Sequence, residues 1–202
     1  MSSLWGWLKE KRRLRELSRL RHEWRHFVWE WCRPYQLETI QSRGPFREIV
    51  ERERGRQAGG LPVDRDALRA GWATIVRGVT HWEDRVGAAV GTWLASEEGA
   101  EWRTRIDGLG ERRRFLVDVG EVVTDMSFVT LAACQAMVKD MMSEAELGIL
   151  MDAITRQENA LIDAVRAIRQ AEQNGTVAPD PRSDSEIRES IREMWDADLA
   201  EG

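Results

Sequence analysis

Residues 64–93, DRDALRAGWATIVRGVTHWEDRVGAAVGTW, contain the clearest structural pattern in the 202-residue chain. Apolar residues recur through this stretch at alternating gaps of four and three, which places them on one face of a long helix. Such a seam is typical of helices that pack against others at a shallow angle, and Asp64 is the expected N-cap. The seam consists of Leu68, Trp72, Ile75, Val79, Trp82, Val86, Ala89 and Trp93. The sequence therefore predicts a helix over about residues 64–96.

Four glycines lie beside this seam. Gly71 and Gly78 are one heptad apart, and Gly87 and Gly91 are one helical turn apart. Glycine lowers helix propensity, so its repeated use in a helix favours a packing reason. The four glycines would let a neighbouring backbone approach the helix closely, and plain surface glycines are the other interpretation.

The same spacing recurs further along the chain. From Phe115 to Ala136 it predicts a helix over about 111–142, with enough additional apolar residues to place it in the middle of a bundle. Ser143 and Glu146 form a capping box, which predicts a third helix over about 144–174. No segment alternates with a period of two, so we expect little or no sheet.

The N-terminal residues 4–33 predict a strongly amphipathic, basic helix that ends at Pro34. The glycines and proline between Gly55 and Pro62 then indicate a hinge. Near the other end of the chain, two prolines in residues 177–181 indicate a stiff linker before a short acidic helix. Cys32 lies close to the predicted helix end beside Arg33, so we expect it to be partly exposed and reactive.

The predicted fold is therefore all-α: a bundle of three to four long helices with a basic N-terminal helix and a short acidic C-terminal helix. We expect three parts: a basic, tryptophan-rich helical head (1–60), a helical bundle core (61–175), and a linker with an acidic tail helix (176–202). Charge supports this division, because residues 1–60 hold 14 Lys and Arg against 8 Asp and Glu, a net charge of +6. The remaining residues hold 16 against 27, a net charge of -11.

Composition excludes several classes of protein. Two isolated cysteines do not make a disulfide scaffold or a cysteine-rich zinc module, and they fit a reducing compartment. No apolar run approaches the roughly 18–20 residues that span a bilayer. We therefore expect a cytoplasmic protein, with a membrane-peripheral position or a place in a larger particle left open. The acidic total charge and the lack of a reader motif argue against nucleic acid as a partner.

One string of residues suggests catalysis. His22-Glu23-Trp24-Arg25-His26 matches the pattern H-E-x-x-H and so resembles the zinc metallopeptidases of the zincin type. The resemblance implies that His22 and His26 bind zinc and that Glu23 activates the metal-bound water. It covers these five residues alone, and the only other histidine is His81. A zinc hydrolase therefore remains an alternative, and our main hypothesis has no metal, no cofactor and no catalytic residue.

The main hypothesis is a non-enzymatic interaction or assembly protein that binds a protein partner or copies of itself. Five of the ten tryptophans lie in the basic head, and aromatic anchors dominate the energetics of interfaces. The contact residues that we select are Trp5, Trp7, Trp29 and Trp195. A structural component of a particle and a cellular adaptor fit equally well. A second alternative is a peripheral binder of anionic membranes through the N-terminal helix.

Overall fold

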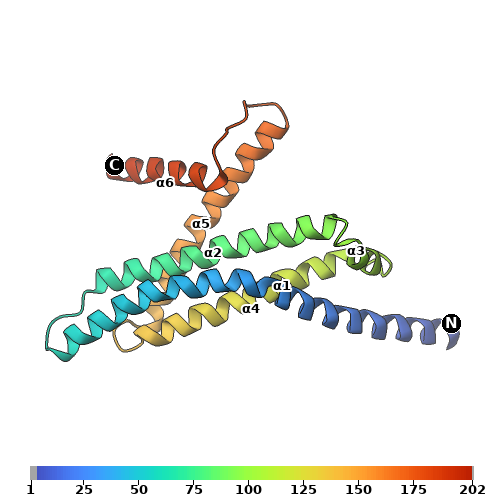
Figure 1. The fold of residues 1–202 in the computed structure, drawn as a ribbon, viewed down its shortest axis with the longest axis horizontal. Coiled ribbons are helices and arrows are strands. Elements are labelled where there is room, and N and C mark those ends of the chain that lie inside the picture. The colour runs from blue at the N-terminus through green and yellow to red at the C-terminus, as the bar shows by residue number, and fades with distance from the viewer. Residues whose placement is uncertain (1–3, 202) are drawn as a thin grey trace. The chain divides into compact units, whose positions relative to one another are not determined.

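The chain is all-helical in a computed structural model that describes the backbone of residues 4–201 and the side chains of residues 6–34 and 43–195. No strand occurs in residues 4–201, which confirms the predicted fold class. Figure 1 shows the helices in chain order. They are α1 (Leu4–Ala58), α2 (Arg65–Ala95), α3 (Ala100–Asp107), α4 (Arg112–Val138), α5 (Glu144–Gln173) and α6 (Asp184–Glu201).

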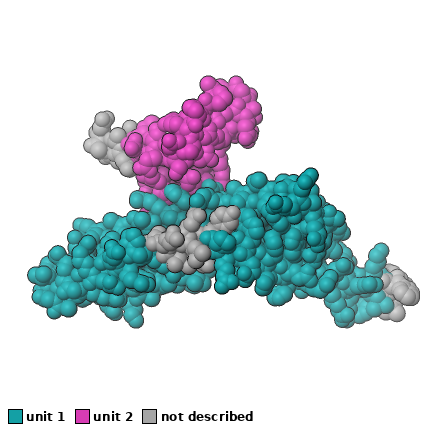
Figure 2. Space-filling model, viewed as in Figure 1, with its two compact units in different colours: residues 1–144 teal, residues 145–202 magenta. Residues whose placement is uncertain are grey.

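The chain divides into two compact units, residues 1–144 and 145–202, coloured teal and magenta in Figure 2. This division does not coincide with the boundaries predicted at residues 60 and 175. Residues 1–60 share a compact unit with the helices that follow them, because α1 packs along both α2 and α4. The tail helix α6 shares the second unit with α5.

The predicted end of the first helix at Pro34 is wrong. Helix α1 is 55 residues long and contains both Pro34 and Pro45. A proline inside a helix removes one backbone hydrogen bond and usually bends or breaks the helix. Here both flanks are held by tertiary packing, with Val28 and Cys32 buried before Pro34 and Phe46 and Val50 buried after Pro45. Burial of these side chains stabilises a helix that local propensity alone would end.

The other predicted boundaries agree closely with the structure. The stretches predicted at 64–96, 111–142 and 144–174 correspond to α2, α4 and α5, and the Asp64 carboxylate accepts a hydrogen bond from the Ala67 amide as an N-cap. The connection between α2 and α4 contains the short helix α3. Within residues 4–201, none of the helices is long and apolar enough to cross a membrane.

The core of the first unit is centred on Trp24, which lies in α1 and is fully buried. Its indole N–H donates a 2.9 Å hydrogen bond to the Phe115 carbonyl oxygen, so the one polar atom of the side chain is satisfied. Aromatic rings from other helices surround it, with Trp102 of α3 5.1 Å and Phe115 of α4 6.4 Å away between ring centroids. This cluster fixes α1 against α3 and α4.

An ion pair lies beside this aromatic cluster. Asp118 of α4 is fully buried, and the Arg21 guanidinium binds it with two hydrogen bonds, one of them 2.8 Å from Nε to Oδ2. Arg25 is a second cation for the same carboxylate, with Nη1 3.6 Å from Oδ1. A buried carboxylate is costly without a partner, so this pairing couples the position of α1 to that of α4.

The connection between α1 and α2 is a tight turn. Gly60 has a φ of 72°, which a residue with a side chain rarely adopts. The buried Glu53 carboxylate accepts a 2.9 Å hydrogen bond from the Asp64 amide, which ties the end of α1 to the start of α2. Gly71 of α2 faces Phe46, and an added Cβ would lie 2.8 Å from its ring. The neighbour at Gly71 is therefore a side chain and not the predicted backbone, and a Cβ added at Gly78 would meet no heavy atom of the described residues within 4 Å.

The second unit is also held together by a buried carboxylate. Glu158 of α5 is fully buried, and Arg192 of α6 binds both of its oxygens at 3.0 and 3.2 Å. Arg169 of α5 reaches the connection to α6, donating to Asp184 and to the Asp180 carbonyl oxygen. Arg192 and Asp184 therefore connect α6 to α5, and the stiff linker is part of that connection.

Removing Arg21 should destabilise the fold. Arg21→Ala leaves the buried Asp118 with Arg25 alone, and we expect a loss of about 2 kcal/mol in the free energy of unfolding. The matched control is Arg19→Ala, because Arg19 is exposed and pairs only with Glu23; that change should cost less than about 0.5 kcal/mol. Urea unfolding followed by tryptophan fluorescence measures both. Equal losses for the two variants would contradict the role given to the ion pair.

The stability of the first unit should also depend on pH through Glu53. The hydrogen bond from the Asp64 amide, followed by that from Arg52, lowers the pKa of Glu53 below its ordinary value of 4.5. A lowered pKa stabilises the fold above the ordinary value, and this contribution is lost as the pH falls through the folded-state pKa. Glu53→Gln should therefore show a smaller decrease in the free energy of unfolding below about pH 4.5 than the parent chain. An unchanged pH dependence would contradict this assignment.

Candidate interaction surface

Two of the four tryptophans selected from the sequence lie on the surface. Trp7 is 54% exposed and Trp29 is 39% exposed, both on α1. Trp195 of α6 is half-buried, and the side chain of Trp5 lies outside the described residues. Trp24, in contrast, is the centre of the core. Among the described tryptophans of α1, the structure therefore places Trp24 and Trp31 in the packing and leaves Trp7 and Trp29 on the surface.

The H-E-x-x-H string lies on the packed part of α1. His22 and His26 are exposed, whereas the Glu23 carboxylate forms ion pairs with Arg105 of α3 and with Arg19. The hydrogen bond from Arg105 lowers the pKa of Glu23. Within the described part of the chain, no group of three His, Cys, Asp or Glu side chains is arranged to hold a metal ion. The donor set of a zincin site is not brought together there.

The arginines in the middle of α1 are paired with acidic residues of α4. Arg13 lies 3.1 Å from Glu111, and Arg25 forms ion pairs with Glu121 and Asp125 in addition to Asp118. These contacts satisfy the cations that lie alongside α4. A second group near the N-terminus, Lys9, Arg12 and Arg15, lacks such partners among the described side chains.

The second group lies in residues 6–16 of α1, which we call the N-terminal segment. All eleven of these residues are exposed. They include Trp7, Leu8 and Leu14, and the Lys11 ammonium lies 4.7 Å from the Trp7 ring centroid. Among the described side chains, Lys9, Arg12 and Arg15 have no acidic partner. The N-terminal segment is therefore an exposed basic helix with apolar residues, and Arg13 pairs it with Glu111.

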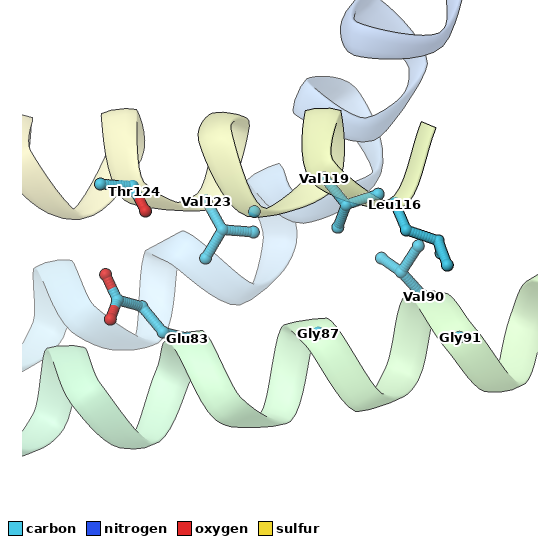
Figure 3. A pocket seen from close by; sticks show the side chains of 9 residues that line it. Glu83, Gly87, Val90, Gly91, Leu116, Val119, Val123 and Thr124 are labelled. Carbon is cyan, nitrogen blue, oxygen red and sulfur yellow. The ribbon is translucent and has the colours of Figure 1, made fainter. Parts of the chain in front are cut away.

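A second open surface lies between α2 and α4. A groove of about 360 Å³ runs between the two helices, as Figure 3 shows. Gly87, Gly91 and Gly120 form part of its walls, and a Cβ added at any of the three would have no heavy atom within 4 Å. The close approach predicted at Gly87 and Gly91 is therefore absent within the described residues. The missing side chains leave a groove.

The two ends of the α2–α4 groove differ in character. At one end the Glu83 and Thr124 side chains point toward each other across the groove, and at the other Val90 and Leu116 lie together (Figure 3). Burial raises the pKa of Glu83, while a hydrogen bond with Ser127 opposes that shift. The groove therefore offers a half-buried acid together with apolar walls.

The exposed face of α4 extends the groove. This face carries the exposed apolar residues Leu116, Val117 and Phe128, and Phe128 is 70% exposed. A shallower depression next to the groove shares Gly120 and Thr124 with it and adds Glu121 and Asp125. Helix α4 is apolar on most sides, as the sequence predicts, but one of its apolar faces remains uncovered within the first unit.

Sequence reasoning did not identify Asp118, Glu158 or the α2–α4 groove. The two acids carried a signal, because each falls within an apolar stripe, Asp118 next to Val119 and Glu158 between Ile154 and Leu161. An acid at such a position indicates a buried ion pair, since an unpaired buried charge is too costly to retain. The groove had no comparable signal, because it depends on which helices pack together.

Comparison with known proteins gives no relative: no protein-family model matches the sequence, and no significant match occurs among the curated proteins or the solved structures. The function is therefore argued from the surfaces of this chain.

Cys32 and Cys134 should be unreactive in the folded protein. The expectation that Cys32 is partly exposed is wrong, because α1 continues past Pro34 and Cys32 is fully buried. Burial raises the pKa of the Cys32 thiol to about 11 and also raises that of Cys134. An aromatic disulfide reagent at pH 8 should label both thiols slowly in buffer and rapidly in urea. Rapid labelling of the folded chain would contradict the buried positions.

Proposed function

We propose that this chain is a non-enzymatic interaction or assembly protein that acts through protein–protein contacts of its helical faces and termini. The observation that carries the proposal is the N-terminal segment, in which eleven consecutive residues are exposed and three are large and apolar. Exposed apolar residues that gather on one element are typical of a contact surface. Tryptophan beside cations is also the composition of interface hot spots.

In this proposal the long helices form a bundle of three to four members that serves as a scaffold. The basic N-terminal helix and the short acidic C-terminal helix present the contact residues, with Trp7 and Trp29 on the first and Trp195 on the second. A rigid scaffold favours affinity, because less conformational freedom is lost when a preorganised helix binds. No catalytic residue, metal or cofactor is part of the proposal.

An anionic membrane surface is the alternative partner for the N-terminal segment. Lysines, arginines and tryptophan on one exposed helix are also the composition of helices that lie in a lipid interface. Binding to a protein and binding to a membrane can be told apart by their salt dependence and by whether vesicles are bound. Binding to vesicles that contain anionic lipid should be strong at low salt and weak at high salt, because the attraction is largely electrostatic.

Trp7→Ala should weaken self-association or partner binding by about tenfold or more, because a tryptophan hot spot contributes about 2 kcal/mol. The matched control is Leu61→Ala, since Leu61 is an exposed apolar residue of similar exposure outside the N-terminal segment. Sedimentation equilibrium and native mass spectrometry of the full chain measure the change. A chain that stays monomeric and partnerless would contradict the proposal, and retention on anionic vesicles alone would favour the membrane alternative.

A further inference from the structure

The α2–α4 groove has the dimensions of a site for a short helix. Along α2 it extends from Glu83 to Gly91, eight residues or about 12 Å at 1.5 Å per residue. Two turns of helix have nearly the same length, about 10.5 Å for seven residues. Because Gly87, Gly91 and Gly120 have no side chains, another helix could place its side chains directly against the backbones of α2 and α4.

The residues around the groove define the chemistry of its occupant. Its polar residues include Glu83, and the adjoining depression adds Glu121 and Asp125, which are about half exposed or more. Arg25, the one basic residue that lines either hollow, pairs with both Glu121 and Asp125, and the three acids still outnumber it. Leu116 and Val117 provide the apolar surface. A complementary occupant is therefore a basic helix with a few large apolar side chains.

The N-terminal segment has this composition. Lys9, Arg12 and Arg15 lack acidic partners among the described side chains, and Trp7 and Leu14 are exposed and seven residues apart. That spacing matches the length of the groove, so both side chains can enter it from one helix. Charge and length are thus complementary between two open surfaces of the same chain.

The N-terminal segment cannot reach the groove of its own chain. It is continuous with the packed part of α1, which Trp24 and Arg21 hold against α4. Within the segment, Arg13 pairs with Glu111, immediately before α4 begins at Arg112, and residues 6–12 extend past this contact. Bringing residues 6–12 back to Gly87 would require α1 to break. The occupant must therefore come from a second copy.

We propose that the N-terminal segment of one copy lies in the α2–α4 groove of a second copy, so that the chain assembles head to tail. The inference rests on the proposed function and names its partner. The contact is heterologous, because the two surfaces that meet are different. Each bound copy still presents a free segment at one end and a free groove at the other. Such a contact closes into a ring or continues as a filament.

Filling the groove should prevent assembly. Gly91→Leu places a side chain where the second helix would lie, and we expect self-association to weaken by about tenfold or more. Gly78→Leu is the matched control, because Gly78 lies on the same helix, outside the groove, and an added Cβ there also meets nothing within 4 Å. It should assemble like the parent chain. Thermal unfolding by circular dichroism checks that both variants are folded.

Mixing two defective variants tests the direction of the contact. Gly91→Leu has a blocked groove and an intact segment, whereas Trp7→Ala combined with Lys11→Glu has an intact groove and a defective segment. Each should be monomeric alone, and an equimolar mixture should give a heterodimer and nothing larger, because only one complementary pair of surfaces remains. Sedimentation velocity and native mass spectrometry, which distinguishes the two masses, measure this.

Three results would overturn the inference: assembly of Gly91→Leu at parental strength, equal losses in Gly91→Leu and Gly78→Leu, or no heterodimer in the mixture. If assembly survives Gly91→Leu but is lost in Trp7→Ala, the proposed function stands and the groove is not the site. If the parent chain is monomeric, the head-to-tail contact is wrong. Binding to anionic vesicles by that monomer, with equal affinity for Gly91→Leu, would assign the segment to a membrane.

Discussion

The burial of Trp24 is the interaction on which the rest of the first unit depends. It satisfies its own N–H at the Phe115 carbonyl, gathers rings from α3 and α4, and lies one helical turn from the Arg21–Asp118 ion pair. Together these contacts hold the middle of α1 in one place and one orientation. Since α1 is continuous, they also determine where its two ends go. The N-terminal segment therefore extends beyond the start of α4, and the far end carries Phe46 and Val50 into the packing with α2.

The placement of α1 determines which of its basic residues find acidic partners. Arg13, Arg21 and Arg25 lie alongside α4 and pair with Glu111, Asp118, Glu121 and Asp125. Lys9, Arg12 and Arg15 have no acidic partner among the described side chains, so they remain available for another molecule. The acidic and apolar surface between α2 and α4 is the reciprocal feature, because glycine at three positions leaves it without a cover. One chain thus presents two complementary surfaces that its own helices keep apart.

The helical class and the limits of α2, α4 and α5 could be predicted because each depends on periodicity and caps, which are local. The passage of α1 through Pro34 could not be predicted, because it depends on burial of Val28 and Cys32 on one side and Phe46 and Val50 on the other. Trp7 and Trp29 were selected from the sequence as contact residues and are exposed, but the sequence alone could not decide what they contact. The α2–α4 groove depends on tertiary pairing, so no single stretch of sequence contains it.

The most direct test of head-to-tail docking is a cross-link between the N-terminal segment and the α2–α4 groove. The native thiols are buried, so single cysteines can be introduced by Arg12→Cys in one preparation and Gly91→Cys in another, each distinguishable by mass. On mixing and mild oxidation, docking in the groove should give a disulfide-linked heterodimer. Gly78→Cys in place of Gly91→Cys should give little of this product. A product consisting only of Arg12→Cys homodimers, or equal yields from positions 78 and 91, would contradict head-to-tail docking in the groove.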